Sequence, residues 1–195
     1  MKTRPIKWDR MTWAITHLAD KKQYEDSLLL LLGAMTGFRI GDLLKFRVID
    51  LTFNNIYELT EQKTGKSRTI PLKKIVEIVK SLGIWDHYGT RKPGSYVFTA
   101  KSGPSAGQKL TVNGANVRIK RILKECMIET PKESTHILRK TYARRLFDLL
   151  LKKLDDKYMA LCIVQKDLNH DSIFTTMTYI GLVDEALEKS YKHFW

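Results

Sequence analysis

The sequence predicts an α+β domain that is mainly α-helical and contains a small three-stranded antiparallel sheet. Two observations predict this fold class. Apolar residues recur at helical spacing along most of the 195 residues, whereas the stretch 48–72 consists of short strand-like runs separated by turn residues. The chain has no internal repeat, low-complexity tract or compositional break. We therefore expect one domain over residues 1–195.

The N-terminal part predicts three helices. Residues 7–19 place their apolar side chains on one helical face. Residues 25–36 predict a second, largely buried helix, which ends at Gly37 because glycine readily adopts the left-handed backbone that stops a helix. A short third helix is expected over residues 40–46.

The sheet is predicted from three runs and the two turns between them. Residues 48–52 are expected to form the first strand, residues 56–62 the second and residues 68–72 the third. Asn54 and Asn55 mark the first turn, and Gly65 marks the second.

The remainder of the chain predicts helices again. A loop with glycine and proline residues is expected over residues 86–108. The segments expected to be helical are 73–82, 112–127, 134–151, 157–168, 173–179 and 184–191.

The charge balance indicates a polyanionic partner. The chain has 34 Lys and Arg against 21 Asp and Glu, a formal net charge of +13. DNA is favoured over a membrane surface, because the basic residues form neither one amphipathic stripe nor a terminal run. The longest apolar run, Leu28 to Leu32, is too short to cross a bilayer, and no secretory signal is visible. We expect a soluble intracellular protein.

The two cysteines, Cys126 and Cys162, lie far apart and no CxxC is present. This pattern indicates reduced thiols, and it favours neither a disulfide framework nor a cysteine zinc site.

Four separated segments carry a set of side chains that suits phosphoryl transfer without a metal: residues 36–44, 62–72, 135–141 and 167–179. They contain arginines, histidines, a tyrosine, and a lysine that is expected on a β-hairpin. Cations stabilise the charge that develops on phosphate oxygens, a tyrosine can act as the nucleophile, and a histidine or lysine can move protons.

The spacing within these segments supports one common site. His136 and Arg139 are three residues apart, so a helix places both on one face. The planar guanidinium of Arg139 matches a phosphate group. Arg39 lies between two glycines at a predicted helix start, where backbone N–H groups point outward. Lys63 is expected at the tip of a β-hairpin.

These segments resemble the tyrosine recombinase (phage integrase) family. Its signature is an Arg in a TGxR helix start, a Lys on a β-hairpin, an HxLR helix, a His in LGH, and a Tyr nine residues beyond that His. The resemblance runs from about Pro5 to the C-terminus, and it departs from the pattern at Asn169, where the family usually has Gly. It implies six catalytic residues: Arg39, Lys63, His136, Arg139, His170 and Tyr179.

The resemblance covers the family's catalytic domain. The N-terminal helical domain with which members usually close around DNA has no counterpart in this sequence. We therefore expect either a fragment or a short member similar to the fimbrial phase-switch recombinases.

The resemblance also implies a mechanism. Tyr179 attacks the scissile phosphate and forms a 3′-phosphotyrosyl link with a free 5′-hydroxyl. Arg39, Arg139 and His170 hold the non-bridging oxygens.

Protons are moved by the remaining residues of the signature. Lys63 protonates the leaving 5′-oxygen, with Lys66 as the alternative donor, and His136 assists proton transfer. No metal, cofactor or ATP is required, because the energy of the broken bond is kept in the phosphotyrosine.

The implied partners are double-stranded DNA and further copies of the chain, a tetramer on paired DNA sites. The aromatic tail 184–195 packs either onto a neighbouring subunit or onto its own domain. Such a protein is expected in the cytoplasm of a prokaryote, associated with the nucleoid, or to be phage-encoded. Candidate DNA contacts are Lys66, Arg68, Arg118, Arg121, Lys140 and Arg144.

Three alternatives remain at the level of the sequence. A type IB topoisomerase-like enzyme would share the chemistry without pairing two sites. A DNA-binding regulator on the same fold would have lost catalysis, which the complete residue set argues against. A structural nucleic-acid-binding protein would explain the charge but not the motifs. No motif encodes the target DNA sequence, because base contacts and DNA shape determine it.

Overall fold

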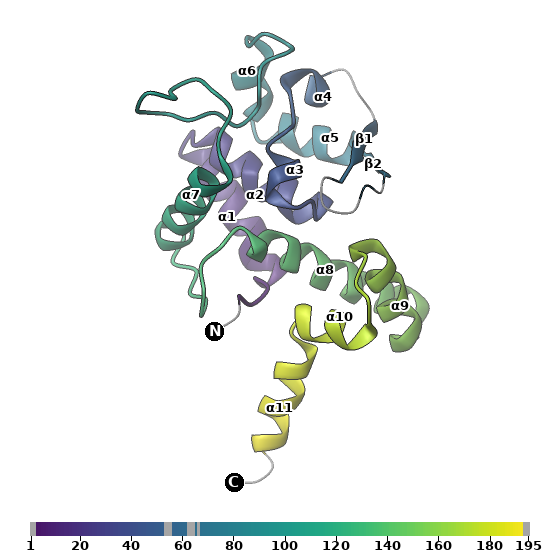
Figure 1. Ribbon diagram of the computed structural model, residues 1–195. Coiled ribbons are helices and arrows are strands. Elements are labelled where there is room, and N and C mark those ends of the chain that lie inside the picture. The colour runs from purple at the N-terminus through teal and green to yellow at the C-terminus, as the bar shows by residue number, and fades with distance from the viewer. Residues whose placement is uncertain (1–2, 53–55, 62–64, 66, 193–195) are drawn as a thin grey trace.

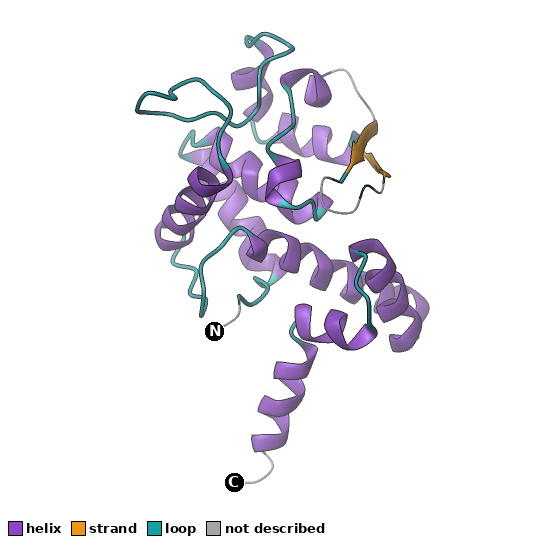
Figure 2. Ribbon diagram, in the orientation of Figure 1, coloured by secondary structure: helices purple, strands orange, loops and turns teal. Residues whose placement is uncertain are grey.

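Figure 1 shows the computed structural model of the chain, which describes residues 3–52, 56–61, 65 and 67–192. Helices make up most of the molecule, and a small antiparallel sheet lies at one edge, as Figure 2 shows by colour. The prediction of a mainly helical α+β fold is confirmed.

The helices and strands follow one another in the order α1 (Trp8–Asp20), α2 (Tyr24–Thr36), α3 (Ile40–Leu43), α4 (Val48–Thr52), β1 (Ile56–Thr60), β2 (Ser67–Pro71), α5 (Lys73–Ser81), α6 (Ile84–Gly89), α7 (Val112–Glu125), α8 (His136–Leu154), α9 (Lys157–Leu168), α10 (Ile173–Tyr179) and α11 (Leu182–Lys192). Every helix that the sequence predicts is present, although several begin or end at a different residue.

The sheet differs from the prediction, because the first expected strand is the helix α4. The carboxylate of Asp50 accepts a hydrogen bond from the backbone N–H of Arg47 at 2.8 Å, which caps the start of this helix. Val48 and Leu51, three residues apart, are both buried, whereas Ile49 is 40% exposed. Within the described residues the sheet therefore has two strands, with Ile56 paired to Pro71 and Thr60 to Ser67.

The region predicted as a loop over residues 86–108 contains the end of a helix, α6. Tyr88 anchors this helix, because its side chain is buried and its hydroxyl donates to the carbonyl oxygen of Val97 at 3.2 Å. The prediction was wrong for this helix, which has six residues and is too short to show a clear apolar period.

Two clusters of buried apolar side chains share the long helix α8. The larger cluster is built around α2, in which the run Leu28 to Leu32 is buried throughout, as expected. The smaller cluster joins the later turns of α8 to α9 and α10. Gly33 lets α2 and α8 approach closely, since a Cβ at this position would lie 2.5 Å from Cδ1 of Leu138. This close approach brings the end of α2 beside the first turns of α8.

The helix α11 has no buried residue. In Figure 1 it extends away from the other helices as the yellow ribbon that leads to the C-terminus. None of the helices in the described ranges is both long and apolar enough to traverse a lipid bilayer.

Candidate active site

Arg39 is placed by the turn that ends α2. Gly37 has a left-handed backbone with φ +63°, and a Cβ there would lie 2.1 Å from Cδ1 of Tyr142. Only glycine meets both conditions without displacing the tyrosine. The chain then turns so that Arg39 becomes the extended residue immediately before α3. This is the helix-start position that the sequence predicts.

His136 and Arg139 come from the first turn of α8. Arg139 is only 4% exposed, and its guanidinium donates to two backbone carbonyl oxygens, Gly37 O at 2.6 Å and Leu168 O at 3.0 Å. Because these carbonyls lie at the ends of α2 and α9, Arg139 connects both helix ends to α8.

His170 is positioned by the turn between α9 and α10. Asn169 ends α9 with a left-handed backbone, φ +53°, at the position where the family usually has glycine. Asparagine is one of the few residues other than glycine that adopts this conformation readily. Nε2 of Gln165 donates to the carbonyl oxygen of His170 at 3.0 Å, and Nδ1 of His170 lies 3.1 Å from Oγ1 of Thr176.

The contact with Thr176 holds the imidazole of His170 in place. The Thr176 hydroxyl oxygen lies 3.3 Å from the carbonyl oxygen of Ser172 and 3.1 Å from Nδ1 of His170. When this hydroxyl donates to the carbonyl, its oxygen accepts from Nδ1–H, and Nε2 of the neutral imidazole is the acceptor.

Tyr179 is the last residue of α10, and its ring packs edge-on against that of His170 with 4.9 Å between the centroids. Nζ of Lys140 lies 5.0 Å from the centre of the tyrosine ring. Burial raises the pKa of the Tyr179 phenol, and the positive charges of Arg139 and Arg39 oppose this only in part. The phenol is therefore protonated at neutral pH and must lose its proton to act as a nucleophile.

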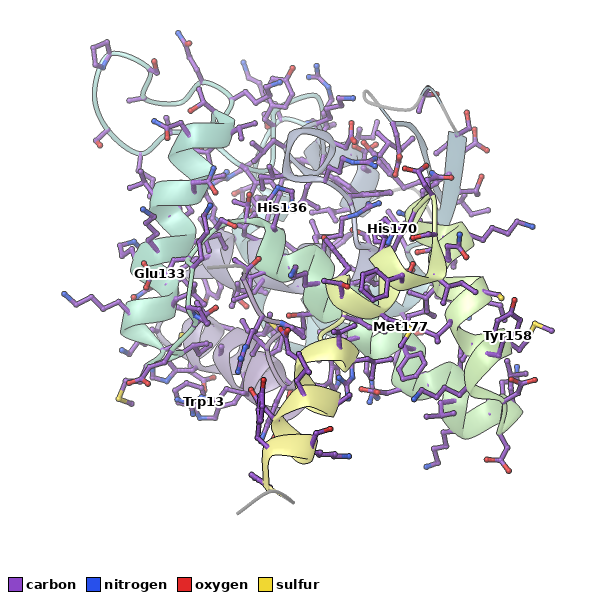
Figure 3. All side chains as sticks on the ribbon, turned by 60° about the horizontal axis from the view of Figure 1, so that its bottom comes forward. Trp13, Glu133, His136, Tyr158, His170 and Met177 are labelled. Atoms are coloured by element: carbon purple, nitrogen blue, oxygen red, sulfur yellow. The ribbon has the colours of Figure 1, made fainter. Side chains whose placement is uncertain are left out.

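Both histidines are biased toward the neutral form. Burial, followed by the positive charge of Arg139, lowers the pKa of His136 and that of His170. A neutral imidazole can accept a proton. The protonated phenol of Tyr179 needs such an acceptor nearby before it can react. Figure 3 labels the two histidines, one on α8 and the other beside α10.

Two cavities meet at His136. One, of about 280 Å³, is lined by Arg39, Arg139 and His136 among others. The second, of about 470 Å³, is lined by His136, Lys140 and Tyr179 among others. His136 thus stands between the arginines and the tyrosine. A larger cavity of about 690 Å³, beside the start of α1, contains none of the predicted catalytic residues.

The sequence did not single out Glu61, which lies directly after β1. Its side chain is completely buried and forms an ion pair with Arg39. Its other carboxylate oxygen lies 3.7 Å from Nη1 of Arg139 and 3.9 Å from Nη1 of Arg68. A single carboxylate at the end of a predicted strand carries no signal of such a role, because Arg39 and Arg139 come from distant parts of the chain.

Five of the six residues in the family signature are described by the structure, and they lie around the cavities and contacts above. Lys63 lies outside the described residues, and so does Lys66, the alternative proton donor and a candidate DNA contact. The choice between these two lysines remains a prediction.

Three of the candidate DNA contacts have partners within the domain and are nearly buried. Arg68 donates to Asp167 at 2.9 Å, Arg118 to Glu25 at 3.2 Å, and Lys140 to the carbonyl oxygen of Thr3 at 2.6 Å. These contacts assign the three side chains a role in the fold.

The other two described candidates are more exposed. Arg121 pairs with Glu125 at 3.2 Å, and Arg144 pairs with Asp148 at 3.0 Å. DNA contact by any of the candidate residues remains a prediction. Within the ranges that the structure describes, no three His, Cys, Asp or Glu side chains lie together in a way that could hold a metal ion.

Residues 9–185 match the phage integrase family. The chain belongs to this family. A curated relative of the integrase domain, the probable integrase/recombinase YoeC of Bacillus subtilis, is 28% identical over 175 residues, which are 89% of this chain and 86% of the relative. Tyrosine recombinase XerD of Listeria innocua is 30% identical over 173 residues, 87% of this chain and 54% of the relative.

A solved structure shares the fold of the integrase domain. The XerH site-specific recombinase bound to palindromic difH substrate, a post-cleavage complex, matches with a TM-score of 0.60 and 22% identity. The match covers 96% of this chain and 52% of that chain, so the integrase domain spans about half the length of this neighbour, as it does of XerD. Family and fold together are those of a tyrosine recombinase catalytic domain.

Proposed function

We propose that this chain is a site-specific DNA recombinase or integrase that cleaves and rejoins DNA strands through a covalent link to Tyr179. The observation that carries the proposal is the cluster at the junction of α8, α9 and α10. There the ring of Tyr179 packs against that of His170, and the charge of Arg139, which lines a cavity together with Arg39, acts on the phenol. A nucleophile, proton acceptors and phosphate-binding guanidiniums are thus combined in one place.

The first step replaces one phosphate ester by another. The phenolic oxygen of Tyr179 bonds to phosphorus while the bond from phosphorus to the 5′-oxygen breaks, which leaves a 3′-phosphotyrosyl link. The phenol proton passes to His136, and the leaving 5′-oxygen takes a proton from Lys63, whose role rests on the family pattern. Arg39 and Arg139 stabilise the charge on the non-bridging oxygens.

The second step reverses the first with a different DNA strand. The 5′-hydroxyl of the partner strand attacks the phosphotyrosine, the bond to Tyr179 breaks, and the phenol regains its proton. One phosphoester bond is lost and one is formed in each step, so the reaction consumes no ATP.

Double-stranded DNA is the proposed substrate. The net charge of +13 supports it, because cationic side chains displace counterions from the phosphate backbone. The neighbour XerH, which shares the fold, is bound to its difH substrate in the solved complex. The two curated relatives are bacterial, which supports a prokaryotic or phage origin and action on DNA in the cytoplasm.

Covalent trapping tests the proposal. The protein is incubated with a pool of nicked random-sequence duplexes, from which the short cleaved fragment diffuses away, and an SDS-resistant protein–DNA adduct is sought. We expect an adduct that Tyr179→Phe abolishes while DNA binding is retained. Tyr158→Phe is the matched control, because Tyr158 is 67% exposed on α9 and should cross-link normally.

Two outcomes would contradict the proposal. A residual adduct in Tyr179→Phe would assign the nucleophile to another residue. DNA binding without any adduct, even on DNA that flanks the native gene, would indicate a regulator that has kept the fold without the chemistry.

The proposed assembly is a homo-oligomer, a tetramer on two paired DNA sites, in which the tail 184–195 packs onto a neighbouring subunit. The observation behind it is that α11 has no buried residue, while Leu187 is 50% and Tyr191 63% exposed. Its contacts with its own domain include an ion pair of Glu185 with Arg144 and one of Glu188 with Arg4. Exposed ion pairs of this kind contribute about 0–1 kcal/mol each.

Removal of residues 184–195 tests this assembly. We expect the truncated chain to fold and bind a single DNA site but to lose pairing of two sites, as measured by light scattering or native electrophoresis with DNA. Unchanged pairing would rule out the exchange of the tail between subunits.

A further inference from the structure

Glu61 occupies an unusual electrostatic position. Its carboxylate is fully buried, yet it lies among three guanidiniums, paired with Arg39 and within 3.7 Å of Arg139 and 3.9 Å of Arg68. A buried carboxylate needs such partners, because an unpaired charge is very costly away from water. Two of these partners, however, are the arginines that the proposed mechanism gives to the phosphate.

The side chain of Arg39 depends on this contact for its orientation. Within the described part of the chain, Glu61 is the one residue to which the Arg39 guanidinium forms a hydrogen bond, through Nη1. The Arg39 side chain is 26% exposed and lines the cavity that it shares with Arg139. A guanidinium has five N–H donors, so the edge away from Glu61 remains for an incoming anion.

Glu61 also changes the charge of the cluster. The charge of Arg68 is offset by Asp167, whose carboxylate lies 2.9 Å from its Nη2. Glu61 then stands against the two remaining guanidiniums, those of Arg39 and Arg139. Asp42, which also lines the cavity, is paired with Lys45 at 2.8 Å. Counted over the described side chains of this cluster, Glu61 leaves one net positive charge where there would otherwise be two, which weakens the attraction for a free anion.

The backbone of Glu61 is fixed as well. Its carbonyl oxygen accepts a hydrogen bond from the N–H of Gly65 at 2.9 Å. The carboxylate therefore extends from a hydrogen-bonded residue that directly follows a paired strand.

We infer that Glu61 is a positioning residue for Arg39, which it orients toward the DNA phosphate, and that it lowers the affinity of the site for free phosphate. This inference deepens the proposed function and rests on it. DNA is held by many further contacts along its backbone and tolerates the weaker attraction, whereas free inorganic phosphate has no other contacts. The carboxylate thus favours the polymer over the small anion.

The first arm of the test needs no DNA. Binding of inorganic phosphate is measured by isothermal titration calorimetry for the wild type and for Glu61→Gln, each with and without Arg39→Ala. Glu61→Gln removes the charge and keeps the shape, so we expect phosphate to bind about tenfold more tightly. The gain should vanish when Arg39→Ala is also present. An unchanged phosphate affinity in Glu61→Gln overturns the inference.

The second arm measures the rate of covalent cleavage and the dissociation constant for DNA separately. In Glu61→Gln we expect cleavage to slow by about tenfold or more, because Arg39 is less well oriented, while DNA binds at least as tightly as to the wild type. Loss of a buried carboxylate can also act through stability alone. Glu25→Gln is the matched control, since Glu25 is 5% exposed and pairs with Arg91 at 3.0 Å and Arg118 at 3.2 Å, away from the cavity.

A structural role is distinguished by this control. If Glu61→Gln and Glu25→Gln lower cleavage and DNA binding together, in proportion to the folded fraction, the inference is overturned. If Glu61→Gln does not fold, Glu61→Asp replaces it, because it keeps the charge and shortens the side chain by one methylene. That variant should bind phosphate like the wild type and cleave more slowly, and wild-type cleavage would overturn the inference.

Failure of the proposed function would be visible separately. If the wild type forms no adduct with any DNA, the recombinase proposal fails, whereas the phosphate arm still decides whether Glu61 restrains the arginine site.

Discussion

The two hydrophobic clusters of this chain support different parts of the site. The larger cluster, around α2, supports the turn with Arg39, and it contains 35 of the buried apolar residues that the structure describes. The smaller cluster, between α8, α9 and α10, contains seven and supports His170 and Tyr179. Stability within a domain follows the number of buried contacts, so Tyr179, the proposed nucleophile, belongs to the less stable unit. We therefore expect local opening to move Tyr179 while the turn with Arg39 stays folded.

The largest expected effect comes from emptying the smaller cluster. Phe147→Ala removes a side chain that is 2% exposed, and the cavity should cost about 3–5 kcal/mol. We expect hydrogen exchange to accelerate in α9 and α10 while α2 keeps its protection. Leu29→Ala, at a fully buried position in the larger cluster, is the control and should weaken protection in both units. Equal loss of protection everywhere in Phe147→Ala would show that the two clusters unfold as one.

The next effect concerns the turn at the end of α2, where Gly37 lies against Tyr142 of α8. Gly37→Ala places a Cβ at φ +63° and 2.1 Å from the ring of Tyr142, so strain and displacement of the ring should together lower the free energy of unfolding by about 2 kcal/mol or more. Gly83→Ala is a close control, because Gly83 has φ +66° but no atom within 4 Å of the added Cβ. Urea denaturation should show a smaller loss of about 1 kcal/mol there. Equal losses would mean that the contact with Tyr142 contributes nothing.

The smallest effect is the dependence of stability on pH. The folded-state pKa of His170 is lowered below its ordinary value near 6.5, by burial first and by Arg139 second. The unfolded chain therefore binds more protons in the interval below pH 6.5, so the free energy of unfolding should fall as the pH decreases from 7 through this interval. His170→Gln should make the decrease less steep, as measured by urea denaturation at pH 7 and pH 5.5. An identical slope in the variant would show that His170 takes no part.

The sequence predicted most of the fold because long amphipathic helices carry a strong periodic signal. It failed where a local contact decides between two structures. The run Val48 to Thr52 has the composition of a strand, but the hydrogen bond from the Arg47 backbone to Asp50 starts a helix there. The helix α6 was missed because six residues give too little periodicity.

The candidate catalytic residues were predicted from sequence motifs. The residues that hold them in place were not. Arg39, Arg139 and Tyr179 belong to short patterns that can be read along the chain. The role of Glu61 depends on side chains that come together only after folding. Arg118 is the opposite case. The sequence places it on a basic helix face, whereas in the structure it is buried and paired with Glu25. Sequence patterns identify residues that belong to short motifs. They do not identify residues whose role depends on contacts with side chains far away in the sequence.

The two carbonyl contacts of Arg139 have a consequence for the way this chain can diverge in evolution. Since its guanidinium holds the ends of α2 and α9, a descendant that no longer cuts DNA would still need an arginine at this position in order to fold. Within the described residues, the phenolic oxygen of Tyr179 forms no comparable hydrogen bond to the ends of these helices. Among divergent copies of this gene, loss of catalysis should therefore first become visible at position 179, while position 139 continues to encode arginine.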